Sequence, residues 1–275
     1  MSYLSVSTWS LHRLLGPLRW TVWDTEEKVQ KTVTEQQTEV LTLLELPAEA
    51  ARRGYRAIEI CHFHFPSIDP TYLNQLKNAF SASGIGLDTL LLDYGDITSP
   101  DESRVVSDFA FIRKWIEIAS LCGAKKIRVI AGEAPPTDER AIHQSAERLL
   151  ELSVFAASQG VEVITENFKS LTSTGASCLS LLERTDYQVR TISDFGNFTG
   201  QQKYKELSMT MPYSASVHAK PQYDEHGYPD ELEFQSCLNV VKEAGYEGSI
   251  VLIYDGPGDM WEGLERVKRL VEAYL

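Results

Sequence analysis

Three side chains that can bind a metal ion each follow a short apolar run in the second half of the chain. Glu166 follows VEVIT, Asp194 follows VRTIS and His218 follows ASV. Two carboxylates and one imidazole that meet at one point suit a divalent ion such as Mn²⁺, Mg²⁺, Zn²⁺ or Co²⁺. The alternative is that each residue only caps a strand end. If the three converge, we expect their ligand atoms about 2–2.5 Å from an ion, or about 3–4 Å apart without one.

Other polar and aromatic residues after apolar runs are candidate binding groups. Lys220 lies two residues after His218 and could bind a carboxylate, a phosphate or a developing oxyanion, although a solvated surface lysine is the alternative. His62 and His64 are two apart and should share one face of a strand. This favours hydrogen bonding to a substrate over a second metal site or aromatic packing. The remaining candidates for substrate binding are Trp9, Asn167 and Asn197.

A repeated pattern predicts the elements that position these residues. Five helix-like stretches end in glycine and lead at once into an apolar, β-branched run, at Gly54, Gly84, Gly123, Gly160 and Gly245. Glycine after a helix favours a left-handed cap, and a continuous apolar run suits a parallel strand that is covered on both faces. Three further runs, Leu4–Val6, Val189–Ile192 and Ala215–Val217, raise the count to eight. We therefore predict a single-domain α/β fold over residues 1–275, a (β/α)8 TIM barrel whose strand ends share one mouth.

An alternative fold and a long first interval also bear on the predicted architecture. An open doubly wound sheet is the alternative, but the residues after the first run, STWSLHRLLG, contain neither GxGxxG nor GxxxxGK[ST]. The first interval is long, and we expect residues 13–45 to form a loop or lid and a helix near the barrel mouth.

Composition excludes several classes of function. The 275 residues include 26 Lys and Arg against 39 Asp and Glu, which gives a net charge of −13. Binding to DNA or RNA requires clustered positive charge, so we expect no nucleic-acid partner. No apolar run is long enough for a membrane helix, and the first residues do not resemble a signal peptide. The four cysteines form no CxxC pair, which is typical of reduced thiols in a cytoplasmic protein.

The order of the motifs resembles a known family. Glu-Asn follows the fifth run, Asp-x-x-Asn the sixth and His-x-Lys the seventh, and GYRAIEI and GYEGSIVLIYDG add to the likeness. Together they resemble the xylose isomerase-like TIM barrel superfamily, and in particular its sugar phosphate isomerase/epimerase branch. The resemblance implies a divalent metal held by Glu166, Asp194, His218 and a second glutamate after the eighth strand. It also implies a small sugar or polyol substrate and a possible homodimer.

The chain departs from this family at the fourth ligand. Ile253 stands where the family has glutamate. Residues two apart on a strand share a face, so Asp255 could supply a ligand or a second acid from one pleat nearer the loops. The alternative is that Asp255 caps the turn formed with Gly256-Pro257-Gly258.

The resemblance also implies a reaction. A divalent-metal isomerase or epimerase would act on a small sugar, sugar phosphate or keto-polyol through an enediolate, with Glu166 as base, Asp255 as second acid and Lys220 assisting. Two alternatives stay open. One is a lyase that dehydrates a keto-polyol or a cyclic hydroxy acid. The other is a binding protein whose metal site is degenerate because of Ile253.

Overall fold

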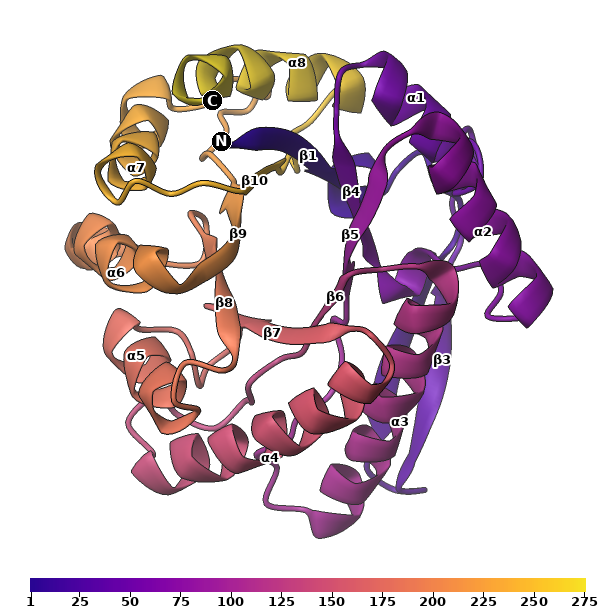
Figure 1. Cartoon of the computed structure of the whole chain (residues 1–275), viewed down its shortest axis with the longest axis vertical. Coiled ribbons are helices and arrows are strands. Elements are labelled where there is room, and N and C mark those ends of the chain that lie inside the picture. The colour runs from indigo at the N-terminus through magenta and orange to yellow at the C-terminus, as the bar shows by residue number, and fades with distance from the viewer.

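Eight parallel strands close into a barrel in the computed structural model, which describes residues 1–275. Their order around the barrel is β1-β10-β9-β8-β7-β6-β5-β4 (Figure 1). Their bounds are β1 (Tyr3–Ser7), β4 (Ala57–Cys61), β5 (Gly86–Leu91), β6 (Lys126–Arg128), β7 (Glu162–Glu166), β8 (Arg190–Asp194), β9 (Ser214–Ala219) and β10 (Ser249–Leu252). The predicted (β/α)8 barrel is confirmed.

Eight helices surround the barrel (Figure 1). They are α1 (Leu46–Arg52), α2 (Pro70–Ser83), α3 (Glu102–Cys122), α4 (Glu139–Ser158), α5 (Gly175–Arg184), α6 (Lys203–Thr210), α7 (Glu231–Glu243) and α8 (Met260–Val271). Five begin at an aspartate whose side chain accepts a hydrogen bond from a backbone N–H of the first turn, namely Asp69, Asp101, Asp138, Asp230 and Asp259. None of the helices is long and apolar enough to cross a membrane.

Apolar side chains fill the space on both sides of the barrel wall. The larger core comprises 57 buried residues, most of them on helices and on the strand faces that meet them. A separate cluster of seven buried residues includes Ile164 and Ile192 and packs against Trp9 and Trp20. Leu91 and Phe63 of this cluster also line the cavity described below. The barrel interior is therefore packed, and that packing supports the residues at its mouth.

Residues 13–45 form a β-hairpin instead of the loop and helix expected from the sequence. Strands β2 (Leu18–Asp24) and β3 (Val29–Glu35) pair antiparallel. Both strands contain threonine and valine, and β2 also contains two tryptophans; such residues favour strands. The Gln30 amide donates to the Ser107 carbonyl and to Asp108 Oδ1, which ties β3 to the neighbouring α3 (Figure 1). At the other strand, Trp20 packs on Phe63, with ring centroids 4.2 Å apart, beside the barrel mouth.

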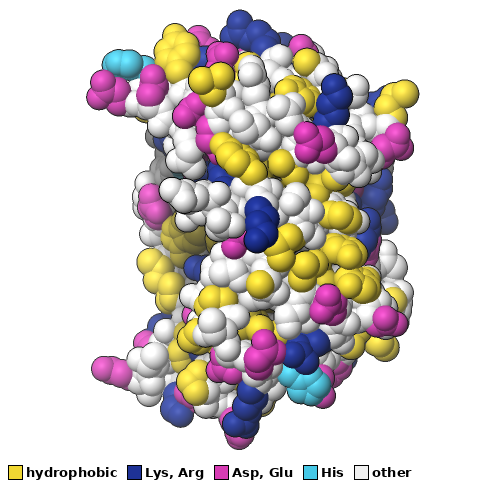
Figure 2. Space-filling view, turned by 90° about the vertical axis from the view of Figure 1, so that its left-hand side faces the viewer, with side chains coloured by type: hydrophobic (Ala, Val, Ile, Leu, Met, Phe, Trp, Pro, Cys, Tyr) yellow, Lys and Arg dark blue, Asp and Glu magenta, His cyan; other side chains and the backbone are white.

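The surface charge is dispersed on the face formed by α5, α6 and α7. Figure 2 shows acidic and basic side chains interspersed among neutral ones over this face. The negative excess of the chain is therefore not gathered into one acidic patch there.

Candidate metal centre

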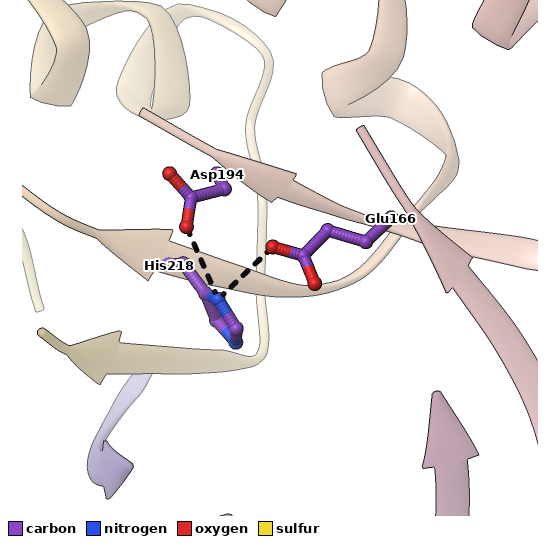
Figure 3. Close-up of side chains that lie close together, drawn as sticks. All are labelled: Glu166, Asp194 and His218. Atoms are coloured by element: carbon purple, nitrogen blue, oxygen red, sulfur yellow. Dashed lines mark ion pairs between the residues drawn. The ribbon is translucent and has the colours of Figure 1, made fainter. Parts of the chain in front are cut away.

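The carboxyl ends of three neighbouring strands bring the predicted ligands together. Glu166 ends β7, Asp194 ends β8, and His218 lies on β9 in register with Asp194. His218 Nδ1 lies 3.5 Å from Glu166 Oε1 and 3.4 Å from Asp194 Oδ2 (Figure 3). All three side chains are buried, and their ligand atoms lie within 4.8 Å of one another. The two distances to His218 are in the range expected for an ion-free ligand set.

Hydrogen bonds orient the two carboxylates. Asp194 Oδ1 accepts from the backbone N–H groups of Gly196, at 2.5 Å, and Asn197, at 3.1 Å, which leaves Oδ2 facing His218. Glu166 Oε1 accepts from the Asn197 side-chain amide at 3.1 Å. Glu166 Oε2 lies 3.0 Å from Arg128 Nε, but this ion pair lacks hydrogen-bond geometry and leaves the oxygen without a donor. One oxygen of each carboxylate is therefore directed at the centre.

Glu59, a fully buried residue of β4, holds His218 from behind. His218 Nε2 lies 2.7 Å from Glu59 Oε2, and Ser216 Oγ donates to Glu59 Oε1. Burial alone would lower the pKa of His218, but Glu59 and Glu166 raise it well above its usual value. Burial alone would raise the pKa of Glu59, but His218 lowers it. The Nε2–H is thus donated to Glu59, and Nδ1 faces the two carboxylates. No role for Glu59 was predicted, although an acid inside the apolar run AIEIC was the available signal.

These donors fit a divalent ion. Glu166 Oε1, Asp194 Oδ2 and His218 Nδ1 would hold it. A carboxylate that accepts the second N–H of a ligating histidine is the usual support of such a site because it fixes the ring and its tautomer. The three residues leave further coordination positions open, as metal sites that act on substrates do.

We expect Glu59→Gln to weaken metal binding about 10–100-fold, the usual cost of losing such a supporting group. The amide can still accept from Nε2, so the change removes the negative charge and little volume. Calorimetric titration with Co²⁺ would measure the effect. Glu162→Gln is a matched control because Glu162 forms an exposed ion pair with Arg190. Equal Co²⁺ affinities for both variants would contradict the role of Glu59.

A cavity of about 280 Å³ opens at the triad. Aromatic rings form one part of its wall, and these belong to Trp9, Trp20, Phe63 and Phe168. Basic side chains form another part, and these are Arg128, Lys169 and Lys220. The predicted residues Trp9, Asn197 and Lys220 therefore lie in the same cavity as the triad. Asn167 does not line it, because its amide exchanges hydrogen bonds with the backbone N–H and C=O of Asp194.

His62 and His64 do not lie in this cavity and do not share a face. Strand β4 ends at Cys61, and residues 62–64 form a 3₁₀ turn, so the two-residue period of a strand no longer applies. His62 Nδ1 accepts from the Asp93 N–H, whereas His64 Nδ1 is hydrogen-bonded to Thr8 Oγ1. Burial lowers the pKa of His62 to about 4 and that of His64 to about 3. Both are thus neutral, buried side chains outside the cavity.

Asp255 does not replace the missing fourth ligand. Strand β10 ends at Leu252, so strand alternation does not extend from Ile253 to Asp255. Ile253 lines the cavity, whereas Asp255 forms an ion pair with Lys220 at 2.7 Å, with both side chains partly exposed. The cluster of possible ligand residues contains only Glu166, Asp194 and His218.

Comparisons with known proteins agree with this architecture. A family model described as "Xylose isomerase-like TIM barrel" matches residues 47–270. No curated protein sequence gives a match. Among solved structures, D-allulose 3-epimerase from Methylomonas sp. in complex with D-allulose has 16% identity and a TM-score of 0.68, over 99% of this chain and 97% of that one.

Two further solved structures are similar. The IOLI protein with a bound zinc atom has 16% identity and a TM-score of 0.70, over 99% of this chain and 97% of that one. The "probable 3-DHS dehydratase AsbF" from Bacillus anthracis has 16% identity and a TM-score of 0.68, over 98% and 99%. At these identities the likeness establishes a shared fold.

Proposed function

The chain belongs to the xylose isomerase-like TIM barrel family, and we propose that it is a divalent-metal-dependent isomerase or epimerase of a small sugar, sugar phosphate or keto-polyol. The observation that carries the proposal is the buried cluster of Glu166, Asp194 and His218 in the cavity. Similar structures with bound zinc and with bound D-allulose support both the ion and the class of substrate.

Glu166 is the proposed base. A divalent ion at this site supplies Lewis-acid stabilisation of the negative charge that develops on a carbonyl oxygen and its neighbouring hydroxyl. Glu166 Oε1 faces the ion position, and Oε2 accepts no hydrogen bond. Glu166 also lines the cavity, so its carboxylate can take the proton from the carbon beside the carbonyl and return it to the neighbouring carbon. Asp194 and His218 stay fixed by their hydrogen bonds throughout.

The absence of a second carboxylate at Ile253 bears on the type of reaction. A two-base epimerisation needs a proton donor on the opposite face of the substrate, and the position directly after β10 offers the apolar side chain of Ile253 instead. A one-base isomerisation needs only Glu166. Elimination of water from a keto-polyol or a hydroxy acid also begins with a single base, which makes a lyase the second candidate. The similarity to a dehydratase supports this candidate.

Metal analysis and isotope exchange test the proposal. Protein purified without chelator should contain, or take up, one Mn²⁺ or Co²⁺ per chain. Incubation of the loaded protein with ketoses and keto-polyols in D₂O should introduce deuterium beside the carbonyl of a true substrate. An isomer as product supports the isomerase, whereas a product that has lost one water supports the lyase.

Two variants make this test specific. Glu166→Gln should abolish deuterium exchange, while the exposed control Glu162→Gln should retain it. A wild-type protein that binds no divalent ion and exchanges no deuterium would contradict both enzymatic candidates. It would favour the remaining alternative, a binding protein with a degenerate site.

A further inference from the structure

A second cavity, which we call the hairpin cavity, is lined by β2, β3, α3 and the residues after β4. It has a volume of about 300 Å³ and shares no lining residue with the cavity at the triad. Arg19 and Thr21 are two apart on β2, and Thr32 pairs with Thr21 across the hairpin, so all three share one face of it. Phe111 and Trp115 are four apart and share one face of α3. Two regular element faces therefore form this cavity.

Aromatic side chains form one wall of the hairpin cavity. The ring centroid of Trp115 lies 5.4 Å from that of Phe65 and 6.1 Å from that of Phe111. His62, which burial keeps neutral, lies edge-on to Trp115 at 5.5 Å. Aromatic rings pack favourably against a further ring in an offset or edge-on arrangement. The volume lies near the lower end of the range of about 300–1,000 Å³ for small-molecule sites, which suits a ligand with one ring.

The charged side chains that line the hairpin cavity are all basic. Arg19 and Lys114 line it, neither forms an ion pair within the protein, and no aspartate or glutamate lines it. In a chain with a net charge of −13, such a lining is selective for negative charge. Arg19 Nη1 donates to the Pro17 carbonyl, which leaves the edge formed by Nε–H and Nη2–H without an acceptor. Two parallel donors of this kind match the two oxygens of a carboxylate.

Two hydroxyl groups in the hairpin cavity are also free to donate. His62 Nδ1 accepts from the Asp93 N–H, so the proton of the neutral ring is on Nε2, which lies 3.4 Å from Thr21 Oγ1. Thr21 Oγ1 thus faces a donor, and its own hydrogen has no acceptor. Ser67 Oγ accepts from the Asp69 N–H, which leaves its hydrogen without an acceptor as well. Both hydroxyls add to the preference of the cavity for a ligand that accepts hydrogen bonds.

We propose that the hairpin cavity is a second binding site, for a small aromatic carboxylate. The carboxylate would meet the free edge of Arg19 with support from Lys114 and the Thr21 hydroxyl, and the ring would pack against Phe111 and Trp115. A cation would find no acid in the lining, and a neutral ring would leave both basic side chains unpaired. The site uses none of the candidate metal ligands, so it goes beyond the proposed function and does not depend on it.

The position of this ligand also gives it an effect on the hairpin. Trp20 precedes Thr21 on β2 and points to the opposite face, where it lines the cavity at the triad. A ligand held by Arg19 on β2 and by Trp115 on α3 would join the two elements. We therefore expect the ligand to stabilise the hairpin against local opening.

Three probes of similar size test the class of ligand by calorimetry. Benzoate should bind about tenfold more tightly than benzamide, which has the same ring but no charge. It should bind about two- to tenfold more tightly than cyclohexanecarboxylate, which has the charge but no aromatic face. The benzoate affinity should be the same with Co²⁺ and with EDTA. Benzoate should also slow amide hydrogen exchange in residues 18–35.

Variants locate the bound benzoate. Arg19→Met should lower its affinity about tenfold, and Lys114→Met, which changes an exposed side chain, about two- to fivefold. Lys169→Met is the control because Lys169 is an exposed lysine that lines the cavity at the triad, and it should bind benzoate like the wild type. Circular dichroism establishes that each variant is folded. Lys114→Met keeps the test decisive if Arg19→Met does not fold.

Several results would overturn the inference. One is a folded wild-type protein that binds no benzoate, and another is equal binding of benzoate and benzamide. A third is benzoate binding that requires Co²⁺, or that is lost in Lys169→Met and retained in Lys114→Met, because the ligand would then lie at the triad. The metal-dependent function is tested separately by Co²⁺ binding and deuterium exchange, so either proposal can fail while the other stands.

Discussion

Replacement of His218 by alanine is expected to lower the affinity for Co²⁺ on the order of 10²–10³-fold. Structural zinc sites with four protein ligands bind with about 10–16 kcal/mol, or about 2.5–4 kcal/mol per ligand, and each 1.4 kcal/mol is tenfold. His218 is one of only three candidate ligands here, and its removal also leaves Glu59 buried without its partner. Calorimetric titration with Co²⁺ measures the change.

His226→Ala is the matched control because His226 is exposed and its one ion-pair partner is the neighbouring Glu225. It should bind Co²⁺ like the wild type. Since an unpaired buried Glu59 destabilises the fold of His218→Ala, Glu166→Gln serves as a second variant that keeps the Glu59–His218 pair. Circular dichroism establishes that each variant is folded. Wild-type Co²⁺ affinity in both folded variants would rule out the proposed centre.

The affinity for Co²⁺ is also expected to rise about tenfold with each pH unit below the pKa of His218. Because Glu59 and Glu166 raise that pKa well above its usual value, the ion-free protein keeps His218 protonated at neutral pH. An ion must displace the Nδ1 proton to bind, so each ion releases one proton. A lower pH therefore favours the protonated, ion-free His218, and a higher pH favours binding of the ion. Above the raised pKa of His218 the affinity for the ion no longer depends on the proton at Nδ1.

Titrations at several pH values, in buffers of different ionisation enthalpy, measure both the slope and the protons released. The Glu59→Gln variant is informative here because it removes the negative charge of Glu59, the first of the groups that raise the pKa of His218. Its affinity should level off at a lower pH than that of the wild type. An affinity for Co²⁺ that stays constant between about pH 6 and pH 8, a range around the ordinary pKa of histidine, would contradict this prediction. It would show that His218 Nδ1 carries no proton for the ion to displace.

The barrel was predictable because its signal is local and repeated. Each glycine that follows a helix-like stretch has a positive φ, at Gly54, Gly84, Gly123, Gly160 and Gly245. Each apolar run that follows is a buried strand, because a parallel barrel strand meets apolar groups on both faces. The local composition of each run therefore predicted a strand, and the number of strand–helix units predicted a closed eight-stranded barrel.

The hairpin was not predicted because its pattern fits two structures. Val29 and Val33 are four apart, a spacing that places side chains on one face in a helix and in a strand alike. The wider content of threonine, valine and tryptophan in residues 18–35 favoured strands. What decides the outcome is pairing between β2 and β3 and the packing of Trp20 on Phe63, which are tertiary contacts.

In the candidate site, too, some residues could be predicted from local sequence and others depend on tertiary contacts. Glu166, Asp194 and His218 could be predicted to lie together because each stands at or next to the end of its own strand. The Glu59–His218 contact joins residues 159 positions apart, and nothing in the linear sequence marks them as partners. His62 and His64 were misplaced because the chain leaves strand geometry at Cys61, one residue before the pair begins.

The β2–β3 hairpin has a consequence for how this protein can diverge from its relatives. The family match begins at residue 47, so Trp9 and Trp20 come from outside the matched region, whereas the three candidate ligands lie inside it. Part of the aromatic wall and the three candidate ligands are thus encoded in different stretches of the gene. Replacement of the hairpin would change the part of the cavity wall that Trp20 forms and would leave the three candidate ligands in place.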